Sequence, residues 1–307
     1  MPEHNLQLGL VGAGRWGRNY VRTIAALDGL RLAAIASRNP ETASLVPPDC
    51  RIVADWHELL AISDLDGVII ASPPATHAEI LLAAIAAGKP LLAEKPVVQS
   101  RVDAESVRRA LARRDAIVLV EHTHLFHPAF RALQREAASA PIRAIRASAG
   151  NRGPYRADVS VLWDWAPHDL AMCLTLVPDS VSVARATRTV GQALEERVNI
   201  TLNLADDVAA DLALSNMDDR HRWFAAEQDA GTLVFRDFVP GKLVRLAPGE
   251  NIYAPGQPIP VSDELPLTRA VLDFADMIRR NDINRASIDL GLRVVDLIGN
   301  IDAMLKR

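Results

Sequence analysis

The hydrophobic pattern of the first 120 residues alternates between two kinds of segment. Short, nearly continuous apolar runs predict buried strands at residues 6–12, 30–37, 66–72, 89–95 and 116–122. Between them, apolar residues at helical spacing predict helices at residues 17–27, 55–62, 77–88 and 103–114. Apolar strands that alternate with helices are typical of a parallel sheet covered on both faces. We therefore predict a doubly wound α/β domain over residues 1–122.

The pattern changes after residue 122. Alternating polar and apolar positions predict strands with one solvated face at residues 142–150, 181–190, 197–205, 207–215, 221–228 and 231–237. Helical spacing returns at residues 128–138, 163–177, 266–280 and 289–307, and the proline and glycine content of residues 251–266 predicts a loop. We therefore predict an α+β domain with an open, mainly antiparallel sheet over residues 123–307. The last helix of this domain could pack back on the first domain.

Composition narrows the function classes. At 307 residues the chain is long enough for two domains. Its net charge of -4 argues against a nucleic-acid partner, whose binding face normally needs clustered Lys and Arg, and against an electrostatic membrane surface. Cys50 and Cys173 lie far apart, which predicts free thiols in a reducing compartment. No apolar run approaches the roughly 18 residues of a membrane helix, so we expect a soluble, cytoplasmic protein.

The stretch GLVGAGRWGRNYVR, residues 9–22, contains three glycines in the pattern G-x-G-x-x-G. They follow the first predicted strand and precede the first predicted helix, which is the context of a dinucleotide site. Gly12 would allow the tight turn, Gly14 the approach of a pyrophosphate, and Gly17 the close packing of helix and strand. Backbone N–H groups around Arg15 and Trp16 would then hold the phosphate. The alternative is a purely structural turn.

The second predicted strand ends in ASRNPE, where a carboxylate would normally bind the adenosine ribose. This chain has Ser37 and Arg38 there, and no acid before Glu41. A hydroxyl beside a guanidinium suits a 2′-phosphate, so NADP is favoured over NAD. In the alternative interpretation Arg38 only stacks on the adenine, and either cofactor is used.

The next strand ends in ASPPATH, at the edge where a doubly wound sheet binds its ligands. Ser72, Pro73 and His77 are therefore further candidates for cofactor contacts. The alternatives are that Ser72 or Thr76 caps the following helix and that His77 is an ordinary surface residue.

Two segments carry candidate catalytic groups. In AEKP, Glu94 and Lys95 end a strand and are candidates for cofactor contacts. The lysine ammonium could also act in catalysis by neutralising charge that develops on a substrate oxygen, although alone it would be a solvated charge. In WDWAPHD, Asp164 and His168 share one face of a helix, so the carboxylate could orient an imidazole suited to proton exchange. The alternative for His168 is a buried, hydrogen-bonded structural residue.

Three histidines in EHTHLFHP, at positions 122, 124 and 127, raise the question of a metal. His122 and His124 have the spacing of a strand near its end, and we expect no metal there. His122 is instead a candidate for substrate contact.

The motifs GAGRWGRNYVR, ASPPATH, EKP, EHTHLFHPAFRAL, NRGPYRADVSVLWDWAPHDL and GLRVVDLI together resemble, in this order, the glucose-fructose oxidoreductase / inositol dehydrogenase / MocA family. The resemblance runs over essentially the whole chain and is most specific in the ordered glycine turn, EKP and Asp-x-x-x-His. The VLWDWAPHD form is similar to a branch of dehydrogenases whose substrates are mostly unassigned.

The resemblance implies an N-terminal Rossmann domain and a C-terminal α+β domain whose open sheet often forms the interface of a homodimer or homotetramer. Members commonly move a hydride between nicotinamide C4 and a carbinol carbon of a sugar, cyclitol or nucleotide sugar. The family's catalytic lysine, aspartate and acid/base histidine fall on Lys95, Asp164 and His168. Lys95 and His168 are expected to converge on one substrate oxygen.

The chain departs from the family pattern at several positions. Ala166 and Ala171 stand where many members have a glycine and an aspartate, and Asp169 follows the histidine directly. A ligand contact made by the missing aspartate is therefore in doubt. Glu121 stands where a glycine is frequent, which would narrow the site or reposition His122.

The segment NRGPYR supplies the other candidate substrate contacts, Asn151, Arg152 and Tyr155. Arg152 could bind an anionic group or simply pair with a surface carboxylate. Two other functions fit the same fold: a non-catalytic nucleotide-binding sensor, which would not need Lys95 or His168, and a reductase of imines or conjugated pyrroles, which would not need His168.

Overall fold

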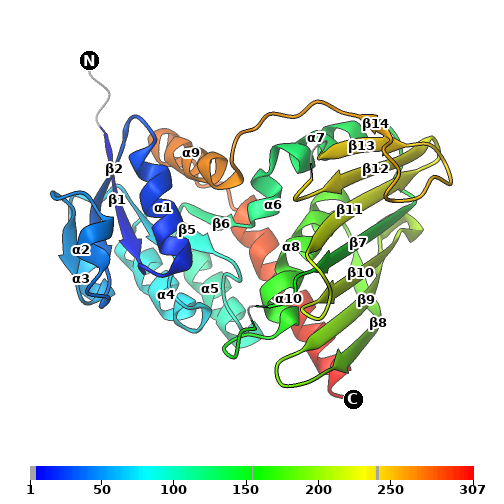
Figure 1. Ribbon diagram of the computed structural model, residues 1–307. Coiled ribbons are helices and arrows are strands. Elements are labelled where there is room, and N and C mark those ends of the chain that lie inside the picture. Colours follow the sequence, from blue (N-terminus) through cyan, green and yellow to red (C-terminus); the bar gives the residue numbers. More distant parts are fainter. Residues whose placement is uncertain (1–4, 154, 240–241) are drawn as a thin grey trace. The chain divides into compact units, whose positions relative to one another are not determined.

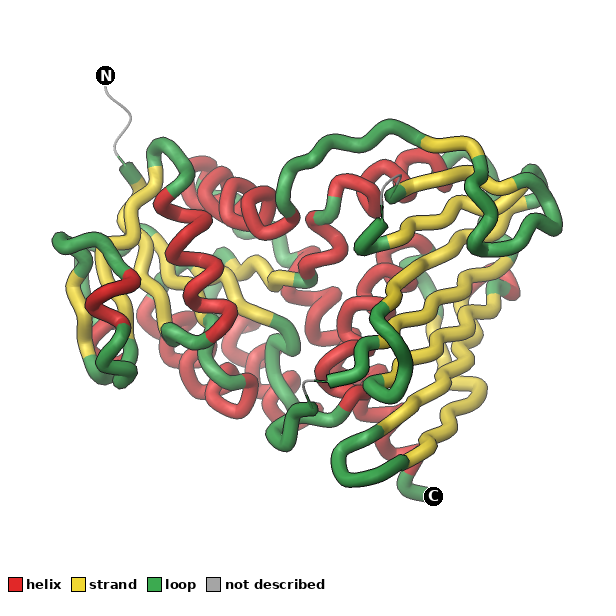
Figure 2. Tube along the Cα trace, in the orientation of Figure 1, coloured by secondary structure: helices red, strands yellow, loops and turns green. Residues whose placement is uncertain are grey.

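The computed structural model describes residues 5–153, 155–239 and 242–307. The chain forms two compact units, shown in Figures 1 and 2. The first comprises Met1–Glu121 and Leu267–Val295, and the second comprises His122–Pro266 and Asp296–Arg307. Residues near the C-terminus thus contribute to both units.

The first unit contains a six-stranded parallel sheet in the order β3-β2-β1-β4-β5-β6. Its strands are β1 (Leu6–Val11), β2 (Leu30–Ala36), β3 (Arg51–Val53), β4 (Gly67–Ile70), β5 (Leu91–Glu94) and β6 (Val118–Glu121). The apolar runs become these strands because both faces are covered, and every residue of β4, β5 and β6 is buried. The order reverses between β1 and β4, which is where such sheets bind ligands. The predicted doubly wound domain is confirmed, and the short β3 is added to it.

Helices connect these strands. They are α1 (Arg15–Ala25), α2 (Thr42–Leu45), α3 (Trp56–Leu60), the 3₁₀ helix η1 (Pro74–Thr76), α4 (His77–Ala87) and α5 (Arg101–Arg113). Two later helices join the unit, α9 (Pro266–Arg280) and the first part of α10 (Ala286–Leu305). Phe274 of α9 packs so closely on β4 that a Cβ at Gly67 would lie 2.8 Å from its ring. The glycine permits this contact between helix and strand.

The second unit contains an eight-stranded sheet in the order β14-β13-β12-β11-β7-β10-β9-β8. Its strands are β7 (Ala144–Gly150), β8 (Val181–Val190), β9 (Glu196–Leu204), β10 (Ala209–Ser215), β11 (His221–Gln228), β12 (Gly231–Arg236), β13 (Leu243–Leu246) and β14 (Gln257–Pro258). Neighbouring strands are antiparallel except β7 and β10, which run parallel. The mainly antiparallel sheet is confirmed; β13 and β14 were not predicted.

The helices of the second unit are α6 (Thr123–Phe126), α7 (Pro128–Ala137) and α8 (Val161–Leu176), and the 3₁₀ helix η2 (Ala205–Asp207) joins β9 to β10. Helix α7 contacts β12 and β13, and α8 contacts β7, β9 and β10 (Figure 1). The buried Pro167 lies within α8. Alternate residues of β9 are buried, as expected of a strand with one face against helices.

Candidate functional site

The glycine turn after β1 has two glycines that the backbone requires and one that it does not. Gly12 has a φ of +102°, and a Cβ there would lie 2.7 Å from the Ala71 carbonyl oxygen. A Cβ at Gly17 would lie 2.0 Å from the Gly12 carbonyl oxygen. At Gly14, by contrast, a Cβ would meet nothing within 4 Å among the described residues. The missing side chain at position 14 therefore leaves open space.

Helix α1 begins beside this space. Gly14 is its N-cap, and no side chain of the described residues caps the helix start. The first N–H groups of the helix, with the positive end of its dipole, are then available to an anion. Arg15 and Trp16, predicted to lie at the cofactor, are both exposed here. The turn fits a pyrophosphate.

The end of β2 carries the predicted ribose-binding residues. The Ser37 hydroxyl accepts hydrogen bonds from the Asn39 N–H at 3.1 Å and the Thr42 hydroxyl at 2.8 Å. Ser37 is thus fixed within its own turn. Arg38 next to it is exposed.

Acidic side chains near Arg38 are already engaged. Glu41 pairs with Arg18 of α1 at 2.8 Å. Asp55, at the start of α3, accepts a hydrogen bond from the His57 N–H, which lowers the pKa of this carboxyl; the nearby Arg38 adds to the effect. Sequence reasoning missed Asp55, whose signal was its position as a helix N-cap after a very short strand.

The end of β4 is organised by hydroxyl groups and a histidine. Ser72 and Thr76 share a hydrogen bond of 2.7 Å between their side chains, and the Thr76 hydroxyl also donates to the Pro73 carbonyl at 2.8 Å. Helix α4 has no side-chain cap at Thr76, so the alternative of a capping residue is wrong for it.

His77 is 1% exposed, and so it is not a surface residue. Its Nδ1 lies 2.9 Å from the Pro96 carbonyl oxygen and its Nε2 lies 2.9 Å from the Ser72 carbonyl oxygen. Burial lowers the pKa of this imidazole, and the two carbonyl groups only partly offset the effect. His77 thus links the backbone segments after β4 and β5.

The end of β5 brings Glu94 and Lys95 to the same edge of the sheet. Glu94 is 4% exposed and accepts a hydrogen bond of 3.0 Å from the Tyr20 hydroxyl of α1. Glu121, which is fully buried, is its register partner on β6. Burial raises the pKa of Glu94 well above its usual range, and the neighbouring Glu121 raises it further. Lys95 is half-buried beside them. Tyr20 is a site residue that sequence reasoning missed.

In the second unit, His168 is 9% exposed on α8 and packs against His124 of α6. The two ring centroids are 4.6 Å apart and the rings are inclined by 73°, an edge-to-face arrangement. Behind them, the buried side chains of Asp169 and Arg222 form an ion pair of 3.0 Å. Asp237 lies 3.8 Å from His124 Nε2. Only His168 of this group was predicted as a functional residue.

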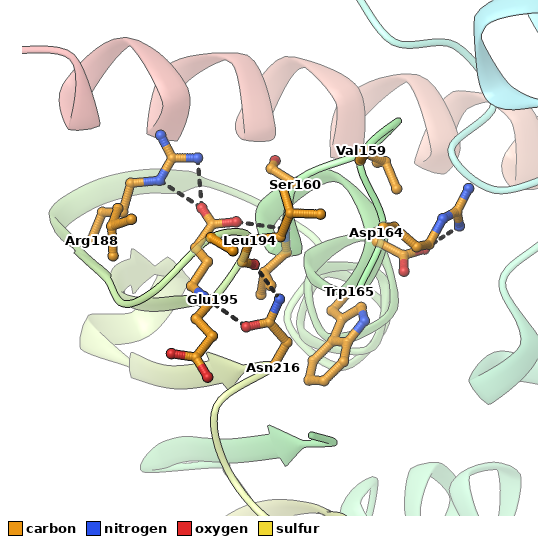
Figure 3. A pocket seen from close by; sticks show the side chains of 14 residues that line it. Val159, Ser160, Asp164, Trp165, Arg188, Leu194, Glu195 and Asn216 are labelled. Atoms are coloured by element: carbon orange, nitrogen blue, oxygen red, sulfur yellow. Dashed lines mark hydrogen bonds and ion pairs between the residues drawn. The ribbon is translucent and has the colours of Figure 1, made fainter. Parts of the chain in front are cut away.

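Asp164 lines a cavity of about 270 Å³ at the start of α8 (Figure 3). Its Oδ1 accepts a hydrogen bond of 3.2 Å from Arg156, a partner that the sequence did not indicate. Tyr155, a predicted substrate residue, is 41% exposed, and its hydroxyl lies 3.3 Å from Glu195 of the same cavity. Across the cavity Glu196 binds Arg188 at 2.6 Å and the Val161 N–H at 2.8 Å.

The other predicted substrate residues differ in accessibility. His122 is almost fully buried at the start of α6. The Asn151 side chain donates to a carbonyl of its own loop at 2.9 Å. Arg152 is exposed and lies 3.8 Å from the exposed Asp219, as in the alternative of a surface ion pair.

Within the described ranges, His, Cys, Asp and Glu side chains do not gather in any group of three able to hold a metal ion. In the same residues, no helix combines the length and apolar character that crossing a membrane requires.

A doubly wound parallel sheet with an open glycine turn at its switch point defines a dinucleotide-binding class of fold. Residues 6–122 match the family model GFO_IDH_MocA, described as an oxidoreductase family with an NAD-binding Rossmann fold. The chain belongs to this family.

Three relatives illustrate the similarity. Inositol 2-dehydrogenase from Paracoccus denitrificans is 32% identical over 173 residues, which cover 53% of this chain but only 50% of that relative. A crystal structure from Magnetospirillum magnetotacticum MS-1, provisionally assigned as an oxidoreductase, is 44% identical with a TM-score of 0.87, covering 96% of this chain and 99% of the other. A 3-ketoreductase from Actinomadura kijaniata in complex with NADP shares the fold at 19% identity, with a TM-score of 0.84 and 98% of each chain covered.

Proposed function

We propose that this protein is an NAD(P)-dependent oxidoreductase that moves a hydride between a nicotinamide and a carbinol or ketone carbon of a small polyhydroxylated substrate: a sugar, cyclitol or nucleotide sugar. The observation that carries this proposal is the open space at Gly14, beside an uncapped helix start at the switch point of the sheet. Gly12 and Gly17 are explained by the backbone, whereas the absence of a side chain at position 14 is explained by a ligand.

The first unit would hold the cofactor, which supplies or accepts the hydride when bound. Backbone N–H groups at the start of α1 would bind its pyrophosphate. Arg38 is exposed at the end of β2, where a free carboxylate would otherwise select a 2′-hydroxyl. These features favour NADP over NAD.

Lys95 and His168 would be the catalytic groups. The Lys95 ammonium would neutralise negative charge that develops on the substrate oxygen. His168 would take the proton from that oxygen during oxidation and return it during reduction. Asp164 accepts a hydrogen bond of 3.2 Å from Arg156. It would orient His168, which lies four residues later on α8.

The similarity to an inositol 2-dehydrogenase supports the substrate class. We also propose a homodimer or homotetramer formed through the sheet of the second unit, and a cytoplasmic location. The oligomeric state and the location are proposals that go beyond the family assignment.

The test has two stages. Thermal unfolding is first measured with NADPH, NADH and a panel of cyclitols and sugar nucleotides, because a ligand that binds only the folded state raises the melting temperature. Single-turnover hydride transfer is then compared in Lys95→Ala, His168→Ala and Asp164→Asn variants. We expect His168→Ala to lose roughly 10²- to 10⁴-fold in rate, Lys95→Ala to lose rate while keeping cofactor affinity, and Asp164→Asn to lose less.

Two results would contradict this function. Cofactor binding without hydride transfer to any substrate would indicate a sensor. A His168→Ala variant as fast as the parent protein would indicate a reductase of imines or pyrroles.

A further inference from the structure

His124 lies next to His168, the proposed acid/base residue. Its ring packs edge-to-face with that of His168, with 4.6 Å between centroids. Both residues are 9% exposed, and they come from α6 and α8, two helices that contact each other. An aromatic contact of this kind restricts the rotation of both rings. His124 thus limits the orientations open to His168.

Asp237, which follows β12, lies next to the ring of His124. Its carboxylate lies 3.8 Å from His124 Nε2, which favours the tautomer with the proton on that nitrogen. Nδ1 is buried and has no hydrogen-bond partner among the described residues. The third contact of the ring is Phe235 of β12, whose centroid is 6.2 Å away. His124 is therefore held by contacts with His168, Asp237 and Phe235.

The charges around His124 come from three further elements. Arg222 of β11 pairs with Asp169 of α8, and their effects on His124 oppose each other. His127, at the start of α7, packs on Phe235. Burial lowers the pKa of His124, and Arg222 lowers it further, against the smaller opposing effects of Asp237 and Asp169. The ring beside His168 is consequently harder to protonate than an exposed imidazole.

A neutral neighbour matters for proton exchange. If His124 carried a charge, an imidazolium at His168 would face a like charge in a buried site, and it would hold its proton less well. Two such groups would titrate as a coupled pair. A neutral His124 lets His168 gain and lose a proton without this repulsion.

We propose that His124, anchored by Asp237, is a positioning residue for His168 and holds its ring through the edge-to-face contact. The proposal deepens the proposed function, because the acid/base role of His168 belongs to that function. It adds His124 and Asp237 to a site in which the sequence indicated Asp164 as the orienting group.

The experiment compares three variants in the complete protein. His124→Ala removes the ring, His124→Phe keeps a ring without a charge, and His127→Asn is the matched control, since it changes a neighbouring buried histidine while preserving an acceptor for its helix. The titration of His168 is followed by nuclear magnetic resonance without substrate, and kcat and KM are measured from pH 5 to 9.

We expect His124→Ala to free the His168 ring, seen as altered line widths and a shifted midpoint, and to lower kcat by up to about 10²-fold with little change in KM. His124→Phe should keep most of kcat, because it retains an uncharged aromatic ring against His168. His127→Asn should leave both His168 readouts unchanged.

An unaltered His168 titration and kcat in His124→Ala would overturn the proposal, as would a loss of kcat in His124→Phe as large as that in His124→Ala. If His124→Ala does not fold, Asp237→Asn provides the same test, because it releases the anchor and should shift the His168 titration. The resonance readout needs no turnover, so it remains decisive even if no substrate is oxidised and the proposed function itself fails.

Discussion

Gly17 lies against Gly12 so closely that a Cβ at position 17 would be 2.0 Å from the Gly12 carbonyl oxygen. The first turn of α1 therefore rests directly on the turn that precedes it. Gly14, between them, has free space instead. One motif thus contains glycines with different physical roles.

These roles predict different results for two substitutions. Gly14→Val should keep the fold and lose cofactor affinity, because the new side chain fills space that the pyrophosphate would need. Gly17→Ala should destabilise the protein by about 1–3 kcal/mol through the forced displacement of α1. Cofactor titration and urea unfolding of both variants separate the two effects. Unimpaired cofactor binding by Gly14→Val would mean that the motif is only a turn.

Arg38 predicts a preference for NADPH over NADH. It is exposed at the end of β2, while the nearby Glu41 is paired with Arg18. Arg38→Ala should weaken NADPH binding by about 1–3 kcal/mol, since a charge-assisted hydrogen bond is lost, and should leave NADH binding nearly unchanged. Arg31→Ala is the matched control, because Arg31 lies on β2 and pairs with Asp49.

Fluorescence titration of both cofactors measures this preference. Equal affinities in the parent protein, or a preference that survives Arg38→Ala, would count against the role of Arg38.

The sequence predicted the fold well where one pattern dominated. The strands of the first unit are buried on both faces, so their apolar runs were unambiguous, and β9 alternates as its sequence does. The three-residue β3 and the two-residue β14 were missed because segments so short carry no detectable period.

The candidate site was predictable only where a motif named it. Gly14 and Lys95 stand in patterns that can be read along the chain. Tyr20 and Glu94 are 74 positions apart, and His124 reaches Asp237 from another element, so these contacts depend on tertiary packing. His77 was assigned to the surface or the cofactor, because nothing in the local sequence shows that two backbone carbonyls enclose its ring.

We expect Glu121 to lower the free energy of unfolding near neutral pH. The burial of Glu94 and the presence of Glu121 raise the pKa of Glu94 above its unfolded value, so its contribution to stability is present at low pH and is lost as pH rises. Glu121→Gln removes the like charge while keeping the shape. We expect it to raise the free energy of unfolding at pH 8 by an amount of order 1 kcal/mol, with a smaller gain at pH 5.

Urea unfolding at the two pH values measures this difference. Glu79→Gln, at an exposed position of α4, is the control and should change neither value much. A Glu121→Gln protein that is less stable than the parent at pH 8 would show that the carboxyl pair is stabilising.

His127 predicts a loss of stability in mild acid. Its Nδ1 accepts the Ala129 N–H at 3.0 Å, and its ring packs on Phe235 with 4.7 Å between centroids. Burial lowers the pKa of His127 from its ordinary 6.5 to about 4. As pH falls between these values, the unfolded chain binds a proton that the folded protein does not, so the free energy of unfolding decreases.

His127→Asn should flatten this dependence by up to ~1.4 kcal/mol per pH unit, the effect of one proton. The amide oxygen of asparagine can replace Nδ1 as the helix cap, so the remaining cost at pH 8 should be the lost ring contact, about 0.5–1.5 kcal/mol. His127→Ala loses both the cap and the ring, and it should be less stable than His127→Asn at pH 8 but equally flat. Urea unfolding from pH 4 to 8 gives all three curves. If the His127→Asn curve has the slope of the parent protein, His127 is not the group that destabilises the fold in acid.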